Sequence, residues 1–226
     1  MRSTWRTLDP VLLRDVLAIA ASVTVSGASF GAITVASGSP WWIPVLMSLV
    51  IFAGGSQFMA VGVVAAGGSP VAAVLAGLVL NVRHLPFGLA VGGVLGPGLP
   101  GKLVGSHLMS DESVAFALAQ RDPARARTAY WACGVALFIS WNVGVLAGAL
   151  VGQSIGDPAV FGLDAAFPAA LLALVLPALR DAPTVRAALV GAVIALVTTP
   201  FVPAGVPVLL ALAGLLALRL PVPVRR

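Results

Sequence analysis

The sequence predicts an all-α protein, a polytopic integral membrane bundle of about six to seven transmembrane spans, and three observations carry this expectation. Of its 226 residues, 59% are hydrophobic and 9% are charged, whereas soluble domains carry about 25% charged residues. Its apolar runs are about 20 residues long, the length of a membrane-spanning helix, while outer-membrane strands would alternate over about 10 residues. Polar residues with glycine or proline interrupt two runs, near 54–57 and 81–86, so we expect broken or re-entrant helices there.

The first two apolar runs cover residues 16–38 and 41–66. The second begins with Trp41 and Trp42, and tryptophan is typical of a membrane interface. An unbroken helix over this run would be about 39 Å long, more than the roughly 30 Å of the hydrocarbon core. The Gly-Gly-Ser-Gln turn at 54–57 is therefore predicted to divide it near its middle.

The third run, 70–96, contains Asn81, Arg83, His84 and Pro86. A proline inside a helix removes a hydrogen bond and clashes with the preceding turn, which predicts a break around this proline. Asn81 and His84 are three residues apart and would share one helix face, while Arg83 would point away from Asn81. A break would let all three line one site.

Arg83 is the only Asp, Glu, Lys or Arg between residues 15 and 102. A lone guanidinium in apolar surroundings requires an ionic partner or a polar cavity. The candidate partners are Asp111, Glu112 and Asp164, and the alternative is that Arg83 binds a ligand. The residues alone leave both roles open.

A polar loop is predicted over 97–127, with a short helix inside it that begins after Ser110 and carries Asp111 and Glu112 in its first turn. These two acids are either a helix cap or groups for gating or coupling. Together with the first three runs, four further spans form a single transmembrane domain over residues 1–226. They are predicted at 128–152, 160–179, 187–203 and 205–220.

The net charge is +5 at pH 7, and the pI is near 11.0. The bases lie mainly at the chain ends and in two short loops, without the clustered bases and interleaved aromatics of a nucleic-acid-binding face, so no nucleic acid partner is expected. The positive-inside rule predicts the cytoplasmic (inner) membrane with both termini in the cytoplasm. It favours an even number of crossings over 16–96, with the run broken at Arg83 re-entrant or only partly crossing. A seven-span arrangement would place the 97–127 loop outside.

No enzyme activity, metal or cofactor is expected. His107 and Asp111 are spaced as metal ligands can be, and Ser56 could be imagined as a nucleophile, but the sequence has neither HExxH nor GxSxG. The single cysteine, Cys133, excludes an intrachain disulfide and a cysteine-based zinc site.

Five segments, in the same order and at similar spacing over nearly the whole chain, resemble the AzlC family. They are FAGGSQF at 52–58, NVRH at 81–84, the acidic pair at 111–112, the region of Trp141, and GLDAAFPA at 162–169. The resemblance implies the large subunit of a two-component exporter of branched-chain amino acids (valine, leucine, isoleucine and analogues), with a small AzlD-type membrane subunit of about four spans. Family members usually read FAGASQF and NLRH, so Gly55 and Val82 are mild departures, and Pro86 is less expected.

An amino acid substrate would present a carboxylate, an ammonium and an apolar side chain. Backbone N–H groups at the start of a helix, or a guanidinium, fit the carboxylate, and amide or carbonyl oxygens fit the ammonium. If the guanidinium binds in a bidentate way, lysine should not replace it. The residues predicted to bind substrate are Phe52, Gly54, Gly55, Ser56, Gln57, Asn81, Arg83, His84 and Trp141.

Purely structural roles are the alternatives to these assignments. The 54–57 turn could be a packing notch, and Asp164 could be an interfacial residue rather than a proton-coupling one. At the level of function, the alternatives are an exporter of another small amino-acid-like metabolite and a non-transporting membrane assembly subunit.

Overall fold

The computed structural model describes residues 10–154, 172, 176 and 179–219. Every regular element assigned within these residues is helical, as the sequence predicts, and none of them is a strand. The chain forms two compact units. Unit 1 is Met1–Gly54 with Asn81–Pro158, and unit 2 is Gly55–Leu80 with Ala159–Arg226.

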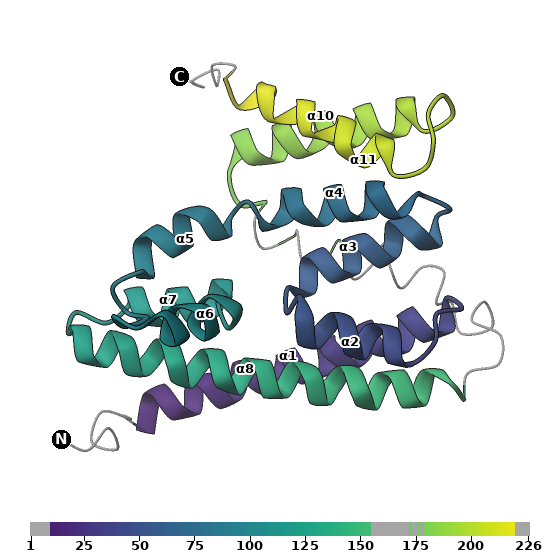
Figure 1. Cartoon of the computed structure of the whole chain (residues 1–226). Coiled ribbons are helices and arrows are strands. Elements are labelled where there is room, and N and C mark those ends of the chain that lie inside the picture. Colours follow the sequence, from purple (N-terminus) through teal and green to yellow (C-terminus); the bar gives the residue numbers. More distant parts are fainter. Residues whose placement is uncertain (1–9, 155–171, 173–175, 177–178, 220–226) are drawn as a thin grey trace. The chain divides into compact units, whose positions relative to one another are not determined.

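Two long helices, α1 (Pro10–Ala36) and α8 (Pro123–Gly152), form the framework of unit 1 and lie side by side (Figure 1). Glycines occupy their contact. A Cβ at Gly27 would lie 2.7 Å from the Trp141 carbonyl oxygen, and a Cβ at Gly144 or Gly148 would overlap a backbone carbonyl of α1. Small residues let two backbones approach this closely, which is the usual basis of helix contact in lipid.

The outer face of α8 is apolar. Exposed large side chains recur along it at helical spacing, namely Val135, Ile139, Val143, Leu146 and Leu150. A helix on a soluble protein would present polar residues there. This face therefore fits contact with lipid rather than water.

Two short helices, α6 (Leu99–His107) and α7 (Asp111–Leu118), follow α5 (His84–Val91) in unit 1. The Ser113 N–H donates to Ser110 Oγ at 3.1 Å, and the Ser110 N–H donates to Ser113 Oγ at 2.9 Å. This reciprocal cap confirms Ser110 as the N-cap of the predicted short helix.

The prediction that the rest of 97–127 is a loop is wrong, because this segment also contains α6 and the first turn of α8. Both helices carry proline in the first turn, and Asp122 caps α8 by accepting from the Arg125 N–H at 2.9 Å. Proline early in a helix and aspartate at its N-cap are recognisable start signals. A loop was predicted despite these signals because the composition of the segment is polar.

The second apolar run is divided as predicted, into α2 (Trp42–Val50) and α3 (Gly54–Ala65). The helical pattern stops at residues 51–53, where Phe52 has a φ of 43°. A positive φ is uncommon for a residue with a side chain and costs roughly 1–2 kcal/mol. Residues 54–57 are thus the first turn of α3, directly after the break rather than inside it.

The third run is also divided where predicted. The helix α4 (Pro70–Asn81) ends before a turn at Val82 and Arg83, and α5 follows. The Leu85 N–H donates to the Val82 carbonyl oxygen at 3.0 Å. In an unbroken α-helix this carbonyl would accept from the N–H of residue 86, but Pro86 has no N–H. The helical hydrogen-bond pattern is therefore interrupted here.

Unit 2 contains most of α3 and α4, together with α10 (Ala182–Thr198), α11 (Val206–Leu210) and the 3-10 helix η4 (Ala211–Arg219). Small residues again set the contacts, because a Cβ at Gly191 would lie 2.8 Å from the Ala211 carbonyl oxygen. The Arg186 guanidinium donates from Nε and Nη2 to the Ala217 carbonyl oxygen at 3.1 and 2.7 Å. This contact satisfies a carbonyl that an irregular helix would otherwise leave open.

Three helical stretches in the described part of the chain are long and apolar enough to cross a membrane: Pro10–Ala36, Pro70–Val91 and Pro123–Gly152. Shorter apolar helices are Gly54–Ala65, Ala182–Thr198 and Val206–Leu218. These six stretches correspond to six of the seven predicted runs. The other predicted span, 160–179, lies mostly outside the described residues, as does Asp164. The number of crossings and the single-domain organisation stay predictions.

Candidate functional site

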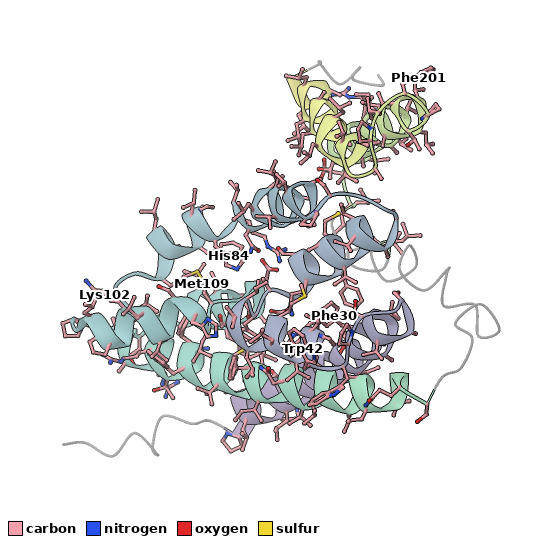
Figure 2. All side chains as sticks on the ribbon, turned by 45° about the vertical axis from the view of Figure 1, so that its right-hand side comes forward. Phe30, Trp42, His84, Lys102, Met109 and Phe201 are labelled. Carbon is pink, nitrogen blue, oxygen red and sulfur yellow. The ribbon has the colours of Figure 1, made fainter. Side chains whose placement is uncertain are left out.

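Unit 1 contains a cavity of about 470 Å³, within the range of about 300–1,000 Å³ typical of small-ligand sites. Three chain segments line it: the α2–α3 break, the junction of α4 and α5, and the end of α6. Its lining residues are Ile51, Phe52, Ala53, Asn81, His84, Leu85, Gly88, Leu89, Ser106, His107 and Met109. His84 and Met109, labelled in Figure 2, come from two of these segments. Three predicted site residues, Phe52, Asn81 and His84, are thus brought together.

The ring of Phe52 belongs to an aromatic cluster beside the cavity. Its centroid lies 5.0 Å from that of Phe138 in an edge-on arrangement and 6.2 Å from that of His107, while His107 and Phe138 are 5.6 Å apart. Such geometries are favourable for aromatic pairs. The backbone at Phe52 is held in a sparsely populated conformation, and strain of this kind is retained where the surroundings over-determine it. The cluster supplies such surroundings.

Asn81 and His84 line the cavity from the two sides of the α4–α5 turn. The His84 Nδ1 lies 3.2 Å from the Asn81 carbonyl oxygen, and its ring makes an edge-on contact with Phe87 at 6.1 Å. With Nδ1 as the donor to that carbonyl, Nε2 would be an acceptor in the neutral ring and a second donor in the protonated ring. These contacts fix the orientation of the ring.

A buried hydrogen bond attaches the end of α6 to α8. The Tyr130 hydroxyl donates to the Gly105 carbonyl oxygen at 2.7 Å, and the Tyr130 side chain is fully buried. Ser106 and His107, which follow Gly105 directly, both line the cavity. Tyr130 is therefore placed to position them.

Tyr130→Phe should lower the free energy of unfolding by about 1–3 kcal/mol, the cost of leaving a buried hydrogen-bonding group unpaired. Because the same bond positions Ser106 and His107, export should fall as well. Thermal melting of the purified chain and an export assay in cells measure the two effects. Thr128→Val is the matched control, since it removes an exposed hydroxyl bond within α8. Equal melting of the two variants would contradict the positioning role.

The other predicted substrate residues do not line the cavity. Gly54 and Trp141 contact each other instead, because a Cβ at Gly54 would lie 2.9 Å from the Trp141 ring, which also stacks on Phe30 with centroids 5.8 Å apart. Ser56 and Gln57 are buried, and Gly55 is half-buried beside them in the first turn of α3. The contact with Trp141 gives Gly54 a packing role at the start of α3.

Arg83 pairs with an acid that the sequence had offered as a partner. Its Nη1 lies 2.9 Å from Asp111 Oδ2, and the two side chains are 41% and 44% exposed. Asp111 begins α7, so the pair ties the α4–α5 turn to that helix. Glu112 lies beside Asp111 in the same first turn and is half-buried.

Sequence reasoning missed several lining residues, above all Ser106, His107 and Met109. His107 had been considered only as a possible metal ligand with Asp111. Within the described residues, no group of three His, Cys, Asp or Glu side chains is arranged to hold a metal ion. The sequence signal that could have found His107 is Pro100, a helix-start residue, which would have predicted the short helix that ends at His107.

Apolar helices, two helix interruptions and a cavity with a few polar groups are the features of a helical membrane transporter. The family model described as AzlC protein matches residues 18–155, more than half of the chain. This protein therefore belongs to the AzlC family, whose members are generally membrane components of branched-chain amino acid exporters and not enzymes.

The matched residues include both helix breaks and the whole cavity lining. The GLDAAFPA segment at 162–169 lies beyond the match. Neither the curated proteins nor the solved structures contain a match to this chain.

Proposed function

We propose that this protein exports branched-chain amino acids from the cytoplasm, in the cytoplasmic membrane and together with a small AzlD-type subunit of about four spans. The observation that carries the proposal is the cavity, which lies within the family-matched residues and has two kinds of wall. Met109 is buried and Ile51, Leu85 and Leu89 are exposed, and together they offer an open apolar side for an aliphatic side chain. Asn81, His84, Ser106 and His107 offer polar groups for its charged end.

The decisive experiment measures valine or leucine accumulation in cells that lack their own exporters and are fed a dipeptide containing that amino acid. Cells would carry this chain alone, the chain with a small AzlD-type subunit, or neither. Export that requires both chains supports the proposal. Retention equal to the empty cells, with both chains present in the membrane, would exclude these amino acids as the cargo.

Two roles compete for Arg83. In the first, its guanidinium binds the substrate carboxylate through two N–H groups, and lysine cannot replace it. In the second, it acts through Asp111, and the single Nη1–Oδ2 contact at 2.9 Å supports this role. A lysine ammonium can supply one such contact.

Arg83→Lys should therefore keep most of the export activity, whereas Arg83→Ala and Asp111→Ala should each reduce it. The double alanine variant should lose no more than either single one, because both remove the same contact. Export rates at equal amounts of membrane protein test this. Loss of export in the lysine variant, with an unaffected Asp111→Ala, would instead assign Arg83 to the substrate.

Gly54 and Trp141, which both belong to unit 1, stay in the proposal as packing supports of the site rather than as part of the cavity wall. The roles of Gly55, Ser56 and Gln57 stay predictions from the sequence.

Both termini are proposed to be cytoplasmic, because the bases gather at the chain ends and in the 97–127 segment. Ser106 is exposed and lines the cavity, so Ser106→Cys is a suitable label site. In a Cys133→Ala background, a membrane-impermeant maleimide should modify it only from the cytoplasmic side. Labelling of intact cells from outside would overturn the even number of crossings before residue 97.

A further inference from the structure

The ionisable groups of the cavity are all of one kind. Among the lining residues that the structure describes, His84 and His107 are the only ones that can carry a charge. The neighbouring ions, Arg83 and Asp111, are paired with each other and cancel. Helix ends of both signs surround the space, since α5 begins at His84 and α6 ends at His107. The described lining side chains themselves therefore include imidazoles but no carboxylate.

The aromatic cluster positions the ring of His107. Its centroid is 5.6 Å from that of Phe138 and 6.2 Å from that of Phe52, distances that are favourable for aromatic pairs. In either protonation state an imidazole carries an N–H donor, and the Ser106 hydroxyl beside it is a second donor.

The polar groups of the lining favour the carboxylate of an amino acid over its ammonium group. A carboxylate would meet imidazole N–H and hydroxyl donors, whereas an ammonium would meet no carboxylate in the described lining and would depend on neutral oxygens. Charge-assisted hydrogen bonds are the strong ones. Recognition should therefore rest on the carboxylate and on the apolar tail.

We propose that the site takes small monocarboxylates with a branched aliphatic tail, and that the α-amino group is dispensable. His107 donates to the carboxylate, and the tail lies against Met109, which is buried, and the exposed side chains of Leu85 and Leu89. The α-oxo acid that corresponds to leucine is then a ligand of the same site, while isoamylamine, which keeps the tail but has no carboxylate, is not. This inference rests on the proposed function.

Calorimetric titration of the full chain in lipid nanodiscs, alone and co-purified with the small subunit, tests it with three probes: leucine, its α-oxo acid and isoamylamine. The α-oxo acid should bind within about tenfold of leucine, because neutral oxygens contribute little to holding the ammonium. Isoamylamine should bind at least about tenfold more weakly than leucine, the usual effect of losing a charge-assisted bond.

His107→Ala should weaken leucine and its α-oxo acid by the same factor, and His107→Gln, which keeps an N–H donor, should restore much of the loss. Lys102→Ala is the matched control, because Lys102 lies on α6 but is exposed and does not line the cavity (Figure 2). Melting of each variant shows whether it is folded.

The outcomes separate the inference from the proposed function. Binding of leucine without the α-oxo acid, or binding of isoamylamine as tight as that of leucine, overturns the inference and leaves the exporter role standing. Binding of the α-oxo acid without leucine supports the inference and overturns the amino acid as cargo. Binding of no probe, with or without the small subunit, overturns both.

Discussion

Gly148→Ala is expected to disrupt the packing of α1 against α8 and to leave little folded protein. A single methyl group at this position would overlap the Ala28 carbonyl oxygen, and the obstacle is backbone that cannot rotate away. Overpacking a tight contact costs about 1–3 kcal/mol when side chains can yield, so the loss here should reach at least that size. Detergent-solubilised yield, the size-exclusion profile and thermal melting measure it.

Gly93→Ala is the matched control for this variant. A Cβ at Gly93 meets no atom within 4 Å among the described residues, so the same glycine-to-alanine change should leave yield and melting near those of the parent. If the two variants behave alike, the close approach of α1 and α8 is not required for the fold.

Phe52→Ala is expected to abolish export. The ring forms part of the cavity wall and closes the cluster with His107 and Phe138. It is only 8% exposed, and truncating a buried phenylalanine costs about 3–5 kcal/mol. The substitution also leaves the positive φ without the contacts that hold it. Export at equal membrane level and thermal melting should both fall.

Phe52→Leu separates the two effects, because leucine keeps apolar volume while the aromatic contacts are lost. Export should fall in this variant even where melting is near the parent. Phe201→Ala is the control for loss of a phenylalanine, since Phe201 is 81% exposed and lies in the turn after α10, where it is labelled in Figure 2. Normal export by the leucine variant would show that export does not require the aromatic ring at position 52.

The helical membrane class could be predicted from the sequence because it depends on composition and on the spacing of apolar residues. Both helix breaks were predicted for local reasons, one from a pair of glycines with polar neighbours and one from Pro86. The cap at Ser110 was predicted on the same basis, from the acids that follow it directly, and the structure adds its partner Ser113. Each of these features is decided by residues close together in the chain.

The residues that line the cavity were harder to predict, because they come from segments that are far apart in the sequence. Asn81 and His84 were predicted as site residues from the interrupted segment around Pro86, and both line the cavity of unit 1. Gly54 and Trp141 were expected at the same site, but the close packing of that glycine on the indole ring keeps both out of the lining. His107 was missed because the segment around it reads as a loop.

The sequence by itself determined that this chain is a bundle of apolar helices and where two of them are interrupted. It also determined the family, through residues 18–155. Only the tertiary structure decided that Arg83 pairs with Asp111 and that His107, rather than an arginine, faces the cavity. The physical reason is that a charge in an apolar segment must find a partner in space, and the partner is chosen by how helices pack rather than by distance along the chain.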